Sequence, residues 1–203
     1  MNQLENLKKV VKSKLGKNDP AHDFEHVMRV YRNAERICKS ENGNKKLILS
    51  AVLLHDIIKI KNRKDSALKS AKLSEKILKD YSFSNDQIKI ICDAIKEHSF
   101  SKGKIPSTIE GKILQDADRL DAIGAIGLAR VFSFSGSNNR PFYDPIDPFS
   151  KNRNLNDNKW ALDHFYEKLL MLEQKMNTKT GKLLAKKRTK VLKDFLKEIK
   201  NEI

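Results

Sequence analysis

A histidine and an aspartate, His55 and Asp56, stand side by side in a mainly apolar stretch of the chain. The stretch covers residues 47–58, so a helix formed there would be buried on all sides rather than amphipathic. An unpaired carboxylate in an apolar interior is costly unless an opposite charge neutralises it. A bound cation would do so, with an oxygen ligand from Asp56 and a nitrogen ligand from His55. The alternative is a hydrogen-bonded His–Asp pair within a core.

Two further side chains are candidates to bind the same cation, His26 and Asp118. His26 belongs to a helix predicted from residue 22 or 23 to about residue 39, and Asp118 to a helix predicted over residues 110–132. Each helix has a large apolar face, so packing against the buried helix would bring the four side chains together. Two imidazoles and two carboxylates suit Mn, Fe, Co, Ni or Zn ions, and Mg less well. On a six-coordinate ion they leave positions for water and a phosphoryl oxygen.

The elements that must position these residues are predicted to be helices. Leu, Ile and Lys dominate the composition and Gly and Pro are sparse, which is typical of an all-α protein. A chain of 203 residues fits one domain, so we expect a single domain over residues 1–203, with a metal-binding helical core at about residues 20–132. Ser84 is predicted to start one helix in a capping box with Gln87. The predicted helices cover residues 2–15, 22–39, 46–58, 66–80, 85–98, 110–132, 159–176 and 182–202.

Residues 133–158 are predicted to form a long loop, because they contain three prolines, Gly136 and little periodicity. Loops of this length inside a compact domain are usually functional or disordered. Aromatic side chains in and beside this segment favour partial packing: Phe132, Phe134, Phe142, Tyr143 and Phe149. We therefore expect a lid or a pocket wall here, followed by two C-terminal helices within residues 159–203.

The chain is strongly basic, with 41 Lys and Arg against 26 Asp and Glu and a net charge of +15. Such a balance favours polyanionic partners, but the charge is spread over solvent-facing helical positions, so nucleic-acid binding is possible and not implied. The two cysteines, Cys38 and Cys92, show no metal-ligand spacing and indicate a reducing, cytoplasmic setting. No segment has the pattern of a secretory signal, and no apolar run is long enough to span a bilayer, so we expect no membrane association. The sequence makes no prediction of oligomeric state.

The pattern His26 … His55-Asp56 … Asp118 resembles the signature of the HD superfamily of metal-dependent phosphohydrolases. The resemblance extends to a bacterial branch of small HD proteins and covers the chain from about residue 20 to the C-terminal helices. It rests on further segments: His22-Asp23-x-x-His26-x-x-Arg29-Val30, Glu97-His98-Ser99-Phe100-Ser101, Gln115-Asp116-Ala117-Asp118-Arg119-Leu120-Asp121-Ala122-Ile123-Gly124, Asp147-Pro148-Phe149 and Asp163-His164-Phe165. It implies an all-α fold, a divalent ion (Mn favoured among Mn, Mg, Fe, Ni, Co and Zn) and hydrolysis of a phosphate ester or anhydride. Members of this branch are similar to nucleoside triphosphate pyrophosphohydrolases.

The same resemblance bears on the acid–base residues. Some HD enzymes carry Glu or Asp three residues after the motif aspartate, where this chain has Lys59. Lys59 resembles the His-Asp-x-x-Lys variant of HD phosphodiesterases, in which the lysine meets phosphate, and a lysine suits anion binding better than base catalysis. His22 is a candidate acid or base beside the metal, although Asp23 next to it could simply cap the helix.

Two more residues have open alternatives. His98 could contact phosphate or protonate the leaving group, or it could complement a helix dipole. Asp121 follows Asp118 by one turn and could orient water or a substrate hydroxyl, or it could form a salt bridge to Arg119 or a nearby lysine. Asp116 lies off the face of Asp118 and is interpreted as structural. Candidates for phosphate contacts are Arg29, Arg119, Arg140 and Arg188.

We therefore predict a metal-dependent phosphohydrolase whose substrate is a phosphorylated small molecule, most simply a nucleotide cleaved as by a nucleoside triphosphate pyrophosphohydrolase. A phosphodiesterase that acts on a cyclic nucleotide or an RNA end is the first alternative. A non-enzymatic, basic module that binds nucleic acid is the second. The second alternative differs because His26→Ala would leave polyanion binding intact, whereas in an enzyme this change would abolish metal uptake and turnover.

Overall fold

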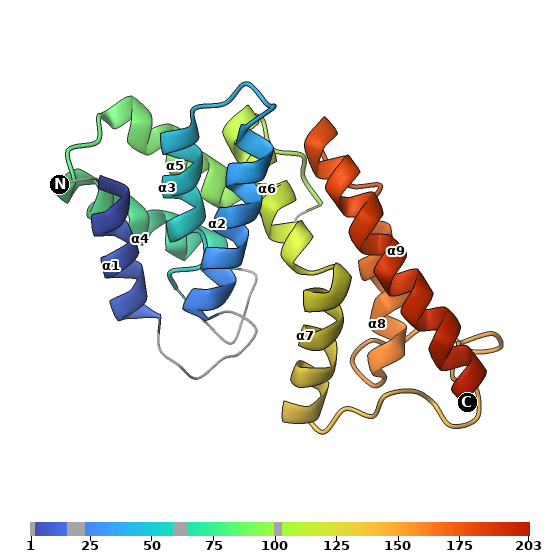
Figure 1. The fold of residues 1–203 in the computed structure, drawn as a ribbon. Coiled ribbons are helices and arrows are strands. Elements are labelled where there is room, and N and C mark those ends of the chain that lie inside the picture. Colours follow the sequence, from blue (N-terminus) through green and yellow to red (C-terminus); the bar gives the residue numbers. More distant parts are fainter. Residues whose placement is uncertain (1–2, 16–22, 59–64, 100–102) are drawn as a thin grey trace. The chain divides into compact units, whose positions relative to one another are not determined.

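The computed structural model describes residues 3–15, 23–58, 65–99 and 103–203, and the secondary structure of these residues is helical, with no strand (Figure 1). The all-α prediction is confirmed. None of the described helices is long and apolar enough to cross a membrane. The elements are α1 Gln3–Lys14, α2 Phe24–Cys38, α3 Lys45–Leu54, α4 Ser66–Asp80, α5 Asn85–Glu97, α6 Ile109–Asp121, α7 Gly124–Ser137, α8 Ala161–Glu167, a 3₁₀ turn η3 Leu169–Met171 and α9 Lys179–Glu202.

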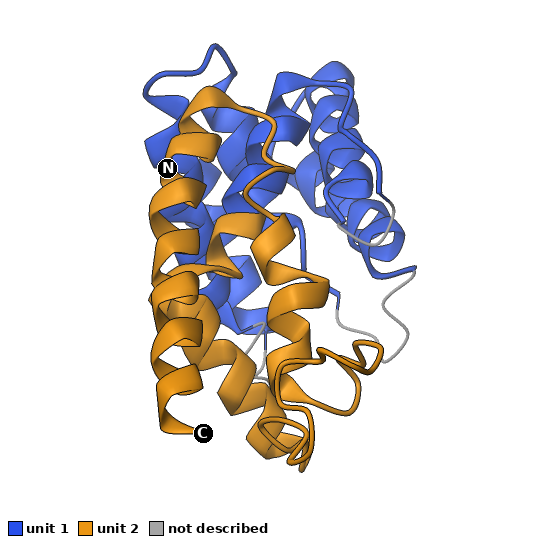
Figure 2. Cartoon of the chain, turned by 90° about the vertical axis from the view of Figure 1, so that its right-hand side faces the viewer, with its two compact units in different colours: residues 1–118 blue, residues 119–203 orange. Residues whose placement is uncertain are grey.

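The chain forms two compact units, Met1–Asp118 and Arg119–Ile203 (Figure 2). In the first unit α3 is the central element and contacts α1, α2, α4 and α5. Every residue of α3 from Leu47 to Leu54 is buried, as expected for a helix that is apolar on all sides. The central, buried helix α3 thus leads directly into the His–Asp pair.

The buried helix is shorter than predicted, because α3 ends at Leu54 and His55 is its C-cap residue. The Nδ1 atom of His55 lies 2.7 Å from the carbonyl oxygen of Val52, the acceptor that the Asp56 amide would use in a continued helix. The imidazole of His55 thus takes the place of the Asp56 amide as the donor to Val52, and the helix ends before the two polar residues. His55 and Asp56 lie in the turn after the helix and not inside it.

Helix starts agree with the sequence. Ser84 accepts a hydrogen bond from the Gln87 amide while the Gln87 side chain accepts one from the Ser84 amide, so the predicted capping box is present. Asp23 caps α2 by accepting a hydrogen bond from the His26 amide at 2.8 Å. The cap that was the alternative reading for Asp23 therefore exists, and it fixes the backbone of His26.

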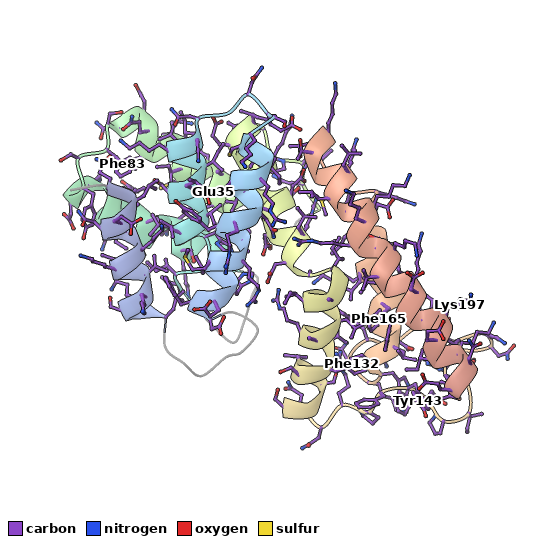
Figure 3. All side chains as sticks on the ribbon, viewed as in Figure 1. Glu35, Phe83, Phe132, Tyr143, Phe165 and Lys197 are labelled. Atoms are coloured by element: carbon purple, nitrogen blue, oxygen red, sulfur yellow. The ribbon has the colours of Figure 1, made fainter. Side chains whose placement is uncertain are left out.

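The second unit is built around an aromatic core. Phe132 of α7 and Phe165 of α8 (both labelled in Figure 3) lie with ring centroids 6.1 Å apart. Phe132 also contacts Phe142 at 5.0 Å and Phe195 of α9 at 5.7 Å, in edge-to-face geometry. The predicted packing of aromatic residues from the long loop is confirmed for Phe142, which ties the loop to the helices.

The single helix predicted over residues 110–132 is wrong, since α6 and α7 are separate helices. α6 ends at Asp121, and Ile123 is extended, with φ −126° and ψ 166°. Gly124 begins α7 with a φ angle of +78°, a left-handed conformation that a residue with a Cβ adopts at a cost. The guanidinium of Arg188 donates a hydrogen bond to the Leu120 carbonyl, which is one of those left without a helical donor by this break. Because α7 continues to Ser137, the loop also begins later than predicted.

The C-terminal part contains the two predicted helices, but the first is much shorter than residues 159–176. It ends at Glu167 because Lys168 takes φ −134° and ψ −57°, outside the helical region, before the 3₁₀ turn η3. In the loop before α8, Asp147 accepts hydrogen bonds from the amides of Lys151 and Asn152. The loop thus has internal order, and its movement as a lid stays a prediction.

We expect Gly127→Ala to destabilise the second unit by about 2 kcal/mol, because a Cβ there would lie 2.2 Å from the carbonyl oxygen of Ala122 and rigid backbone would have to shift. Gly136→Ala in the same helix is the control, since its Cβ would meet nothing within 4 Å. Urea unfolding would measure both. A Gly127→Ala protein as stable as Gly136→Ala would contradict the close approach.

Candidate metal centre

Four side chains from the first unit converge as the sequence predicts. Helix α2 supplies His26, the turn after α3 supplies His55 and Asp56, and α6 supplies Asp118. The Nε2 atom of His26 lies 3.6 Å from Asp118 Oδ1 and 4.0 Å from Asp56 Oδ2. The Nε2 atom of His55 lies 3.9 Å from Asp118 Oδ1 and 3.8 Å from Asp56 Oδ2. Two nitrogens thus face the same two oxygens.

These separations fit ligands of one ion. Atoms bound to a common ion at about 2.0–2.2 Å lie at most about 4.4 Å apart, when they are on opposite sides of it. Both imidazoles are buried, at 1% and 0% exposed, whereas the Asp56 and Asp118 side chains are 24% and 29% exposed. The two imidazoles are therefore shielded from solvent, whereas the two carboxylates are partly accessible to it. Nitrogen and carboxylate ligands together suit a divalent transition metal or Zn.

The tautomer of His55 prepares it for a cation. Its Nδ1 atom faces the Val52 carbonyl oxygen, which only accepts, so Nδ1 carries the hydrogen and Nε2 carries the lone pair. Among the described residues no hydrogen-bond partner reaches His55 Nε2. A hydrogen bond from the far ring nitrogen to a backbone carbonyl is the usual way in which a metal-binding histidine is oriented.

His98 lies beside this group, at the C-cap of α5. Its Nε2 atom is 3.9 Å from Asp56 Oδ1, and its ring contacts that of His55 edge-on, with centroids 5.1 Å apart. Its Nδ1 atom faces the carbonyl oxygen of Ile95 at 2.6 Å, which repeats the arrangement of His55 one helix away. Burial lowers the pKa of His98, and the neighbouring His55 lowers it further. His55, Asp56 and His98 form a second group that could hold a metal ion.

The remaining predicted site residues have different outcomes. His22 and Lys59 lie outside the described residues. Asp121 is 1% exposed and pairs with Arg130 of α7 through Oδ2 at 2.6 Å, so the salt bridge has a different partner from those expected. Its predicted role beside the substrate stays a prediction. Asp116 is fully buried.

Most candidate arginines bond to the protein itself. Arg119 donates to the Lys175 carbonyl, Arg188 to the Leu120 carbonyl, and Arg140 to the Ser135 hydroxyl at 2.8 and 3.0 Å. Burial lowers the pKa of Arg140. These contacts orient helices and loops of the second unit, and they leave these three guanidinium groups with less freedom to follow a phosphate.

Sequence reasoning missed two positioning residues. Asn33 is 4% exposed and donates from Nδ2 to the Ala117 carbonyl at 3.0 Å, next to Asp118. Gln115 is fully buried, and its two Nε2 N–H groups are shared among the carbonyl oxygens of Glu97, His98 and Lys104, which lie 3.1–3.3 Å away. Asn33 follows His26 by seven residues and thus lies on the same face of α2, a spacing that points both side chains at α6. That spacing was the available signal, together with a polar residue inside an apolar stripe.

Comparisons with known proteins agree with this geometry. The HD domain family matches residues 23–123. The Bacillus subtilis protein YpgQ is 32% identical over 207 residues, which covers 100% of this chain and 95% of YpgQ. A crystal structure of YpgQ in complex with ADP has a TM-score of 0.77, 31% identity, and covers 99% of this chain and 95% of YpgQ.

A further similar structure is that of a hydrolase. The crystal structure of a HD-superfamily hydrolase from Bacillus thuringiensis has a TM-score of 0.79 and 33% identity, and the match covers 98% of this chain and 96% of that protein. Identity at this level over nearly the full length of both chains goes beyond a shared fold. The matched region also contains every residue of the candidate metal centre. This chain therefore belongs to the HD superfamily, whose members include hydrolases.

Proposed function

We propose that this protein is a metal-dependent phosphohydrolase that acts on nucleotides, most simply as a nucleoside triphosphate pyrophosphohydrolase. The observation that carries the proposal is the convergence of His26, His55, Asp56 and Asp118, with nitrogen and oxygen atoms 3.6–4.0 Å apart at a partly open position. A divalent ion held by these four ligands would lower the pKa of a water molecule and polarise a phosphoryl oxygen. Mn is the favoured ion.

Two observations support a nucleotide as substrate. The YpgQ protein, 31% identical to this chain, was crystallised with ADP. The net charge of +15 attracts polyanions and raises their local concentration at the surface. Within the site we propose that Lys59 neutralises phosphate, and that Asp121 and His22 orient water or substrate.

His98 is proposed as the group that protonates the leaving oxygen. Because Nδ1–H is committed to the Ile95 carbonyl, only a proton on Nε2 could be donated, and Nε2 is the atom that faces Asp56. The negative charge of Asp56 favours the protonated form of His98, whereas burial disfavours it. The charge of a bound substrate would therefore decide whether Nε2 carries the proton.

For His98→Asn we expect the kcat for a nucleoside triphosphate to fall about 100-fold, as for loss of a general acid. The loss should be smaller for a substrate with a nitrophenolate leaving group, which departs without a proton. Metal content, measured by elemental analysis, should stay at that of the parent protein, because His98 is not one of the four proposed ligands. A parallel loss of metal would instead assign His98 to the metal shell.

The direct test is incubation of protein loaded with Mn, and then with Mg, Ni or Co, with ribo- and deoxyribonucleoside triphosphates. Phosphorus NMR identifies the products. Pyrophosphate and a monophosphate would support attack at the α-phosphorus, whereas orthophosphate would mean removal of the terminal phosphate. Cleavage of only a cyclic nucleotide or RNA would replace the proposal by a phosphodiesterase, and no turnover with any metal or substrate would overturn it.

We also propose that the two units act together as one HD domain in the cytoplasm. Full-length matches to HD proteins of similar size support a single domain. Burial raises the pKa of both Cys38 and Cys92 to about 11, so these thiols are protonated at neutral pH and poorly reactive. Poorly reactive thiols, buried at Cys92 and half-buried at Cys38, agree with the lack of a metal-ligand spacing between the two cysteines.

A further inference from the structure

Helix α9 carries a large share of the positive charge of the protein. Its residues Lys179–Glu202 include nine Lys and Arg and three Asp and Glu, a net +6 of the total +15. Seven lysines recur at intervals of three or four residues along it, and all seven are exposed: Lys179, Lys182, Lys186, Lys190, Lys193, Lys197 and Lys200. At 100° per residue these lysines occupy a band about 80° wide. We call this band the lysine face.

The lysine face differs from an ordinary solvated surface, in which opposite charges alternate. Lys79 of α4 pairs with Glu75 at 2.9 Å. On α5, Asp93 pairs with lysines on both sides, Lys89 at 2.8 Å and Lys96 at 3.0 Å. Such pairs at spacings of three or four residues stabilise exposed helices.

On α9 the two signs are separated instead. The acidic residues Asp194, Glu198 and Glu202 follow one another at intervals of four, so they form a row of their own beside the lysine face. Among the described residues, Lys190 is the only one of the seven lysines with an ion pair within α9, to Asp194 at 2.6 Å. The separation costs helix-stabilising pairs and leaves a continuous row of positive charge.

We propose that the lysine face of α9 binds the phosphodiester backbone of nucleic acid without sequence preference. From Lys179 to Lys200 the helix rises about 32 Å, and one strand of a duplex presents a phosphate about every 3.4 Å of axis. Lysines are flexible point charges that suit such contacts, whereas base recognition needs rigid donors that this face lacks. The lysine face and the backbone of a nucleic acid are thus complementary in charge, and both present charged groups at regular intervals over the length of α9.

A nucleic acid fits the lysine face better than a lipid surface. Helices that bind membranes insert an apolar face below the charged one. The apolar face of α9 is buried within the second unit, through Ala185, Leu192 and Leu196. Of the apolar residues of α9, Leu183 and Val191 are exposed, but two separate side chains do not form the apolar face that such helices insert, so contact with a membrane would rest mainly on charge. The proposal is independent of the metal centre, because every residue that it uses belongs to α9.

The test compares two variants with equal loss of charge. In the first, Lys182, Lys186, Lys193 and Lys197 of α9 are changed to Gln. In the control, the exposed lysines Lys69, Lys72, Lys76 and Lys79 of α4 are changed to Gln. Gln keeps helix propensity, so circular dichroism should be unchanged in both. Fluorescence anisotropy with labelled single-stranded RNA and duplex DNA, each long enough to span α9, measures binding between about 50 and 200 mM salt.

We expect the α9 variant to bind RNA and DNA at least about 10-fold more weakly at low salt, and to lower the slope of log affinity against log salt by up to about 3 on single strands. The α4 control should change the affinity less than about 3-fold. Equal losses in the two variants would overturn the proposal, because net charge alone would explain them. It would also be overturned if the parent binds neither nucleic acid, or binds only vesicles of anionic phospholipid. Triphosphate turnover, assayed in parallel, reports on the metal centre separately.

Discussion

Asp118→Asn is expected to lower the turnover of a nucleoside triphosphate by about 1000-fold or more and to remove most of the bound metal. The change replaces a carboxylate oxygen by a neutral amide of the same shape. Asp118 Oδ1 lies near both histidine nitrogens, at 3.6 Å from Nε2 of His26 and 3.9 Å from Nε2 of His55. Loss of its charge removes a strong ligand and half of the carboxylate charge that offsets a divalent cation.

The measurement has three parts, so that loss of metal is separated from loss of fold. Elemental analysis of protein dialysed against Mn gives the metal content, phosphorus NMR gives the turnover, and circular dichroism gives the helicity. Asp80→Asn is the matched control, since Asp80 is an exposed aspartate at the end of α4. It should keep the metal content and turnover of the parent. An Asp118→Asn protein with parental metal content would remove Asp118 from the ligand set.

A related distinction concerns the binding-module alternative. If the metal centre were a structural remnant, Asp118→Asn would change neither nucleotide turnover, which would be absent, nor the affinity for RNA. If the proposals for the metal centre and for α9 both hold, this change abolishes turnover and leaves RNA affinity unchanged. The lysine variant of α9 should show the reverse. The pair of variants therefore assigns the two surfaces independently.

The convergence of the four candidate ligands was predictable because polar side chains stand out within or directly after apolar helical segments. His55 and Asp56 interrupt the most apolar segment, and Asp118 belongs to a sequence run specific to the family. Helix ends were less predictable, since periodicity continues across them. At the break between α6 and α7, the Leu120 carbonyl accepts a hydrogen bond from Arg188, which is distant in sequence. Local patterns contain no signal for such a contact.

Burial of the supporting polar residues was also hidden from the sequence. The two N–H groups of Gln115 are shared by three backbone carbonyls, those of Glu97 and His98 at the end of α5 and that of Lys104 in the loop after it. The resemblance to HD proteins marks the segment that begins at Gln115, but it does not show what this side chain binds, because the requirement comes from carbonyls left open elsewhere in the chain. The candidate ligands can thus be predicted from residue type and spacing. The role of a residue such as Gln115 can be recognised only when the positions of the carbonyl oxygens around it are known.

Asp163→Ala is expected to lower the free energy of unfolding of the second unit by about 3 kcal/mol. Asp163 is 1% exposed and holds Arg153 by two parallel contacts, at 2.5 Å to Nη1 and 2.8 Å to Nη2. It also accepts a hydrogen bond from the Asn156 amide at 2.7 Å. Its removal leaves the Asn156 amide without its acceptor, and it leaves the Arg153 guanidinium with only the more distant Asp144 and backbone carbonyls as partners. This loss costs more than the loss of an exposed pair.

Urea unfolding followed by the fluorescence of Trp160 would measure this loss, because Trp160 is the single tryptophan and stands directly before α8. Asp194→Ala is the control: it breaks an exposed pair with Lys190 and should cost about 0.5 kcal/mol or less. Replacing Arg153 and Asp163 together by Met and Leu should recover part of the stability, since the guanidinium that lost its closest partner is then removed as well. A loss for Asp163→Ala as small as that of the control would mean that water replaces the pair. The long loop would then be held by its aromatic contact to Phe132 rather than by this charge pair.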